Sequence, residues 1–221
     1  MIVLRAFSAL LSYPTQELRD ALPEIGDCVR GSPLVSAGER EPLLRLVDDL
    51  AAGDLLDIEA RYVDLFDRGR ATSLNLFEHL HGDSRDRGQA MVELKRHYEK
   101  AGFELASREL PDFLPMVLEY LSCRDIEEAR DMLADCAHIL RRIGEALFAR
   151  DSSYAAVFQA LLAIAREPLI DTAAVRRIPE PPIEHLDREW AEPPAFGGDP
   201  QNATPATVSP SAARDLRHGR T

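Results

Sequence analysis

Aromatic residues make up only 6% of this 221-residue chain, and cysteine occurs only three times. With so few aromatics, Leu, Ala, Ile and Val must fill the core, and small or unbranched side chains favour helices. Cys28, Cys123 and Cys136 are widely spaced and odd in number, which excludes a disulfide framework and a zinc ribbon. Cys136 lies among apolar residues, so we expect a small buried hydrophobe in a reducing compartment.

Motifs of the common enzyme classes are also missing. The chain has no Gly-rich phosphate loop, no Rossmann pattern and no Gly-x-Ser-x-Gly elbow. Glu78 and His81 form one Glu-x-x-His, but paired-metal bundles use two such motifs with two further carboxylates. The nearest second copy, Asp135 to His138, follows the apolar register of its helix. A di-metal site is therefore kept as an alternative, and His79 and His81 are also expected to line a pocket or to hydrogen-bond within their loop.

Positive charge is scarce, because the formal net charge is -12. Such a chain is a poor partner for nucleic acid, since phosphate binding requires clustered Lys and Arg, and for an anionic membrane surface. The charge favours a basic ligand, although solubility alone explains it equally well. The apolar N-terminal stretch is interrupted by Arg5, is too short to span a bilayer and lacks the features of a signal peptide. We expect no stable membrane association.

Apolar residues recur at helical spacing almost throughout, and alternating strand patterns are absent. Pro23 is expected to bend or split its helix. The first predicted helix ends near Ser12, the second runs from a Thr15 cap to a turn at Gly31 and Pro33, and the third covers 43–50. The fourth runs from an Asp54 cap to Gly69, the fifth from about 85 to 102, and the sixth starts with Pro111 at its first position. One continuous helical pattern follows over 125–150, and the last helix covers about 152–166.

The C-terminal part has a different composition. Proline, alanine and serine replace large apolar residues there, so the segment buries too little surface to offset the entropy of ordering it. The sequence therefore predicts an all-α fold: one helical-bundle domain over residues 1–175 and an extended, mostly disordered tail over residues 176–221.

Residues 62–119 carry a series of motifs in fixed order. This order is similar to that of the NarJ-type nitrate reductase assembly chaperones, a branch of the redox-enzyme maturation chaperones. Leu11-Ser12-Tyr13-Pro14 and Leu118-Glu119 agree with it, whereas Phe113 stands where many relatives in other branches carry His. The motifs are Tyr62-x-x-Leu65-Phe66-x-x-Gly69, Leu74 with Phe77-Glu78-His79, Asp86-Arg87-Gly88-x-Ala90-Met91, Tyr98-x-x-Ala101-Gly102 and Glu109-Leu110-Pro111-Asp112-x-Leu114-Pro115.

The resemblance implies a cytoplasmic, all-helical chaperone that is not an enzyme. It implies binding of the apo catalytic subunit of respiratory nitrate reductase, including its N-terminal segment, until the molybdenum cofactor is inserted and before membrane attachment. The cofactor then belongs to the client, and this chain is expected to hold none. Contact with molybdenum cofactor delivery proteins is a further expectation. The alternative client is another molybdoenzyme, such as an S- or N-oxide reductase.

A basic amphipathic client segment needs a groove with apolar walls and a few carboxylates. Several candidates also lie in helical register, which is equally typical of core residues. Asp112 alternatively marks only a helix start, and Arg87 alternatively pairs with Glu78 inside the fold. The candidate client-binding residues are Tyr62, Phe66, Glu78, His79, Arg87, Met91, Tyr98, Glu109, Asp112, Phe113, Leu114 and Glu119.

Overall fold

The computed structural model describes residues 1–81, 85–104 and 109–177. The chain divides into two units, Met1–Pro179 and Glu180–Thr221. Apart from residues 176 and 177, the expected tail over 176–221 lies outside the described residues, and its disorder stays a prediction.

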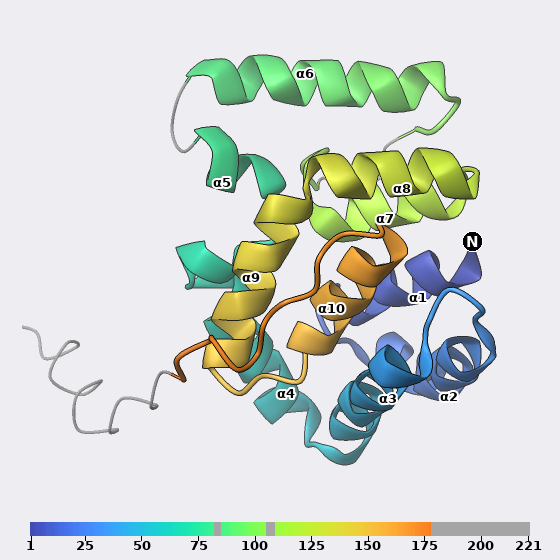
Figure 1. Ribbon diagram of the computed structural model, residues 1–221, viewed down its shortest axis with the longest axis vertical. Coiled ribbons are helices and arrows are strands. Elements are labelled where there is room, and N and C mark those ends of the chain that lie inside the picture. Colours follow the sequence, from blue (N-terminus) through green and yellow to red (C-terminus); the bar gives the residue numbers. More distant parts are fainter. Residues whose placement is uncertain (82–84, 105–108, 178–221) are drawn as a thin grey trace, which may run out of the picture. The chain divides into compact units, whose positions relative to one another are not determined.

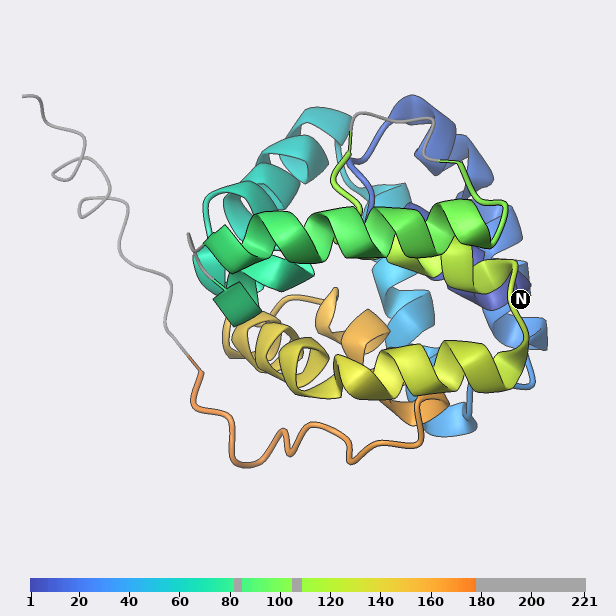
Figure 2. The ribbon, with the colours of Figure 1, turned by 90° about the horizontal axis from the view of Figure 1, so that it is seen from above.

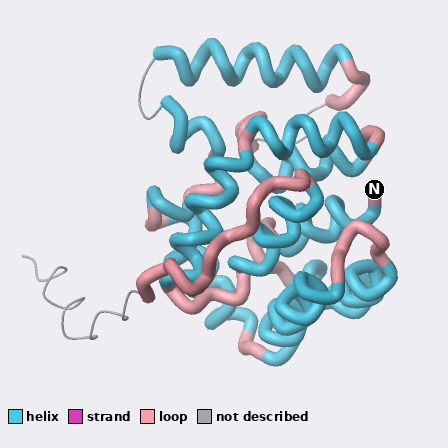
Figure 3. Tube along the Cα trace, in the orientation of Figure 1, coloured by secondary structure: helices cyan, strands magenta, loops and turns pink. Residues whose placement is uncertain are grey.

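The described residues form ten α-helices and no strand, apart from one isolated bridge between Asn75 and Phe113, so the predicted all-α fold is confirmed (Figures 1 and 3). A π-helical turn, η1 (Val63–Asp67), and a 3-10 turn, η2 (Arg70–Thr72), follow the fourth helix. The helices are α1 (Ile2–Leu10), α2 (Gln16–Gly31), α3 (Ala37–Ala52), α4 (Leu55–Tyr62), α5 (Leu76–His81), α6 (Arg85–Lys100), α7 (Leu114–Ser122), α8 (Ile126–Asp135), α9 (Ala137–Ala149) and α10 (Ala155–Ile164).

Helix starts follow the capping residues in the sequence. The Thr15 hydroxyl accepts the Leu18 amide at the start of α2, and the Asp54 carboxylate accepts the Leu56 amide at the start of α4. Both caps were predicted, and each gives a partner to an amide that has none within its helix. Pro23 does not split α2, because the helix buries one apolar face on both sides of it.

The predicted continuous helix over 125–150 is wrong. The chain breaks at Cys136, and α8 and α9 lie on either side of the break. Apolar residues before and after Cys136 all face the core, so the periodicity continues although the helix does not. Cys136 itself is half-buried, its thiol donates to the Met132 carbonyl oxygen at 3.3 Å, and burial raises the pKa of the thiol to about 12.

The predicted helix start at Pro111 is also wrong. Helix α7 begins at Leu114, with Pro115 rather than Pro111 in its first turn. The physical reason is that the backbone of Asp112 and Leu114 pairs with residues 74–76 and is not free to continue a helix.

The core is formed mainly by α1 against α7, α9 against α10 and α2 against α3. Helix α10 is apolar on nearly all sides and is buried over most of its length. Helix α6 packs mainly against α5 and lies outermost, with no other element over it in the view from above (Figure 2). Within the described ranges, no helix has the length and apolar character needed to cross a membrane.

Gly144 sets the distance between α9 and its neighbours. A Cβ atom at this position would lie 2.5 Å from Ile170 Cδ1 and 2.9 Å from Phe158 Cβ. We expect Gly144→Ala to lower the free energy of unfolding by about 1–3 kcal/mol, because overpacking forces shifts in a filled core. Gly31→Ala is the matched control, since a Cβ there meets nothing within 4 Å. Urea unfolding of both variants checks this, and equal stabilities would contradict it.

Candidate functional site

Two short backbone segments meet beside α5 and α7. The Leu114 amide donates to the Leu74 carbonyl oxygen at 2.8 Å, and the Leu76 amide donates to the Asp112 carbonyl oxygen at 3.1 Å. Asn75 and Phe113 form the isolated antiparallel bridge between them. The segments lie over 30 residues apart in the chain, so this pairing fixes α5 relative to α7.

The Asp112 carboxylate strengthens the same junction. Its Oδ2 accepts the Phe77 amide at 2.9 Å. That amide lies in the first turn of α5, where it has no acceptor within the helix. Asp112 is fully buried, and its Oδ1 has no hydrogen-bond partner among the described residues. Burial raises the pKa of Asp112, whereas the Phe77 amide and the Arg87 guanidinium act in the opposite direction.

An ion pair links α5 to α6. Arg87 Nη2 lies 3.2 Å from Glu78 Oε1, and the two side chains are 22% and 29% exposed. The alternative in which these residues pair inside the fold is therefore confirmed. His79 Nε2 lies 2.9 Å from the Ser73 carbonyl oxygen, as in the alternative in which it hydrogen-bonds locally.

A cluster of aromatic rings holds the other end of α6. The Tyr98 hydroxyl donates to the Pro111 carbonyl oxygen at 2.9 Å, and its ring lies 4.7 Å from that of Tyr120. The Tyr120 hydroxyl donates to Glu128 Oε1 at 2.8 Å and lies 3.1 Å from His97 Nε2. The contact between His97 and Tyr120 was not predicted from the sequence. Tyr120 could have indicated this contact, because the hydroxyl of a buried tyrosine needs a hydrogen-bond partner.

Tyr62 and Phe66 belong to a second aromatic cluster. Their ring centroids are 4.8 Å apart, and that of Phe66 lies 5.1 Å from Tyr154. The Tyr62 hydroxyl donates to the Leu11 carbonyl oxygen at 2.8 Å. Burial raises the pKa of Tyr62, and nearby Glu109 adds to the effect. These rings therefore hold the bundle together.

Burial divides the twelve predicted site residues into three groups. Five have their side chains in the interior: Tyr62, Phe66, Tyr98, Asp112 and Leu114. Five are half-buried: Glu78, His79, Arg87, Met91 and Phe113. Two are exposed: Glu109 and Glu119. The half-buried and exposed groups have surface that a partner can contact, and the buried group positions them.

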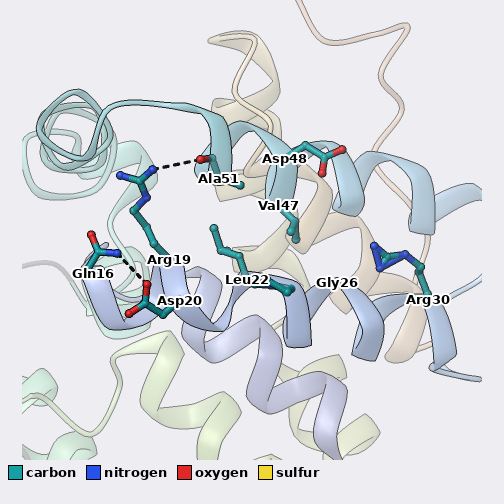
Figure 4. Close-up of a pocket in the computed structure, with 10 residues that line it drawn as sticks. Gln16, Arg19, Asp20, Leu22, Gly26, Arg30, Val47, Asp48 and Ala51 are labelled. Atoms are coloured by element: carbon teal, nitrogen blue, oxygen red, sulfur yellow. Dashed lines mark hydrogen bonds between the residues drawn. The ribbon is translucent and has the colours of Figure 1, made fainter.

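A groove of about 550 Å³ lies elsewhere, between α2 and α3 (Figure 4). Leu22 and Val47 give it an apolar floor, while Arg19 and Arg30 lie toward opposite ends. Arg19 is held by the Ala51 carbonyl oxygen at 3.2 Å. None of the predicted site residues lines this groove, and no motif in the sequence indicated it.

The metal-binding alternative finds no support in the donor geometry. No three His, Cys, Asp or Glu side chains within residues 1–81, 85–104 and 109–177 are placed to hold a metal ion. Glu78, the first ligand of that hypothesis, is engaged by Arg87. The side chain of His81, its second ligand, lies outside the description.

Residues 32–160 match the model of the nitrate reductase delta subunit family. The chain belongs to this family. It is 42% identical over 196 residues to the nitrate reductase molybdenum cofactor assembly chaperone NarJ of Escherichia coli K12, which covers 87% of this chain and 83% of that protein. It is 37% identical to the probable chaperone NarW of E. coli K12 over 196 residues, which are 87% of this chain and 82% of NarW. The probable NarJ of Bacillus subtilis is 33% identical over 162 residues, 73% of this chain and 87% of that protein.

The family match includes all the motifs of residues 62–119, and the resemblance drawn from them is confirmed. Helices α1 and α2 precede the matched residues. The α2 side of the groove in Figure 4 therefore lies outside the family model, whereas the junction of α5, α6 and α7 lies within it.

The raised pKa of Asp112 predicts a pH dependence of stability. A carboxyl whose pKa is higher in the folded than in the unfolded chain contributes stability below its ordinary value of 3.8. That contribution is lost as pH rises through the folded pKa. Asp112→Asn keeps an acceptor for the Phe77 amide and does not titrate. We expect the wild type to lose stability relative to Asp112→Asn as pH rises from about 4 to about 7.

Urea unfolding of both proteins across this range measures the difference. Asp125→Asn is the control, because Asp125 is an exposed cap of α8. A difference between the wild type and Asp112→Asn that stays constant with pH would contradict the assignment.

Proposed function

We propose that this chain is an assembly chaperone that binds the apo catalytic subunit of nitrate reductase. It keeps that subunit competent for insertion of the molybdenum cofactor before membrane attachment. The observation that carries the proposal is the 42% identity over 87% of the chain to NarJ of E. coli, which is named a nitrate reductase molybdenum cofactor assembly chaperone. The half-buried and exposed predicted residues around α5, α6 and α7 support it as a surface for a polypeptide.

The proposed client contact is the N-terminal segment of the catalytic subunit, a basic amphipathic stretch. Phe113 and Met91 are half-buried and offer apolar surface, while Glu109 and Glu119 are exposed carboxylates. A client Arg that meets such an exposed carboxylate forms a charge-assisted hydrogen bond, and an exposed pair of this kind contributes about 0.2–1 kcal/mol. Buried Asp112 fixes α5 next to α7 through the Phe77 amide.

A pull-down with the purified full chain tests the proposal. We expect capture of the catalytic subunit of nitrate reductase in its cofactor-free form and weak capture of the cofactor-loaded form. An S- or N-oxide reductase catalytic subunit serves as the competing client. Equal or preferential capture of that subunit would contradict the assignment to nitrate reductase.

Charge at the surface is tested by titration calorimetry with the client's N-terminal peptide. We expect Glu109→Gln together with Glu119→Gln to weaken binding by about 3- to 10-fold at low salt, because exposed ion pairs contribute about 0.2–1 kcal/mol each. Asp131→Gln together with Asp135→Gln removes two exposed carboxylates from α8 and is the matched control. The contact assignment fails if both double variants weaken binding equally, or if neither does.

A further inference from the structure

Helix α6 differs in charge from the rest of the chain. Both lysines of the protein, Lys95 and Lys100, lie in it. Five basic and three acidic residues give α6 a net charge of +2, whereas the whole chain carries -12. The charge of this helix therefore favours an acidic ligand where its cations are exposed.

Part of this positive charge is not neutralised within the fold. Glu78 pairs with Arg87, and Glu99 lies 3.9 Å from Lys95. Arg96 and Lys100 are exposed, and neither has an acidic partner in the described part of the chain. Two unpaired cations one helical turn apart form a charge pattern that a partner helix can match.

The two cations continue an outward ridge along α6. Gly88, Val92, Arg96 and Lys100 follow one another at intervals of four residues, so they lie along one side of the helix. All four are exposed, and Val92 leaves 45% of its surface open. Helix α6 as a whole has no other element over it in the view of Figure 2.

Gly88 has no role in packing among the described residues. A Cβ atom built there meets nothing within 4 Å. Glycine inside a helix is less favourable than alanine by roughly 0.5–1 kcal/mol. At Gly88 this cost is not offset by a close packing contact among the described residues. A missing side chain on an exposed ridge allows another backbone to approach closely.

We propose that the ridge Gly88–Val92–Arg96–Lys100 docks an acidic amphipathic helix of a protein partner. The partner backbone approaches α6 at Gly88, an apolar residue covers Val92, and carboxylates pair with Arg96 and Lys100. The occupant differs in charge from the basic client segment, so the ridge is a second surface that is independent of the proposed client contact.

Fluorescence anisotropy with the full chain tests this proposal. The probe is a labelled synthetic helical peptide with Leu at intervals of three and four residues and Glu at most other positions. Its matched counterpart has Lys in place of Glu. We expect the acidic peptide to bind. We expect the affinity of the basic peptide to stay the same when residues of the ridge are changed. Arg96→Glu with Lys100→Glu weakens binding of the acidic peptide by about tenfold, in line with the loss and reversal of two exposed pairs.

Two further variants separate docking from general attraction. Gly88→Leu adds a side chain where a Cβ atom meets nothing within 4 Å, and it is expected to weaken binding of the acidic peptide by a similar factor. Arg142→Glu reverses an exposed charge on α9 and is expected to change little. No binding of the acidic peptide would overturn the proposal. So would the same loss in Arg142→Glu, or unchanged affinity in Gly88→Leu.

Carbodiimide coupling gives an independent readout, because it joins a lysine to a contacting carboxylate. All lysines of the chain lie in α6, so a product that maps to a lysine reports on this helix. Lys100→Arg is expected to keep the affinity and to lose most of the product. Coupling that maps only to the N-terminal amine would overturn the proposal.

Discussion

The arrangement of the site depends on the hydrogen bond from the Phe77 amide to the buried Asp112 carboxylate. A short helix such as α5 is not stable by itself, and its first amides need acceptors from elsewhere. Asp112 supplies one, while the pairing of Leu74 with Leu114 supplies the adjoining backbone contact. Without this junction, Glu78 would not be held where it meets Arg87 and fixes the start of α6.

The junction explains why the family signature contains both buried and exposed residues. Tyr98 holds the far end of α6 through Pro111, directly before Asp112. The signature is therefore largely a set of internal contacts that fix three helices, and the surface residues between them contact other proteins in the proposed function. The buried residues affect partner binding by fixing the positions of the surface residues.

Helix spacing, caps and the family could be predicted from the sequence because they depend on local patterns. Thr15 and Asp54 cap their helices as expected. The break at Cys136 was missed because the apolar register continues across it, and the start at Leu114 was missed because long-range pairing occupies Asp112. Core and surface members of the predicted site could not be told apart, since Tyr98 and Met91 occupy similar helical positions but differ in burial.

The most direct test of the role of Asp112 is amide hydrogen exchange at Phe77. In the wild type this amide is expected to exchange slowly, because it is bonded to a fully buried carboxylate. In Asp112→Ala we expect fast exchange at Phe77 and Leu114, with amides in α9 unchanged. Equal protection of Phe77 in both proteins would show that α5 is held by other contacts and would contradict the account.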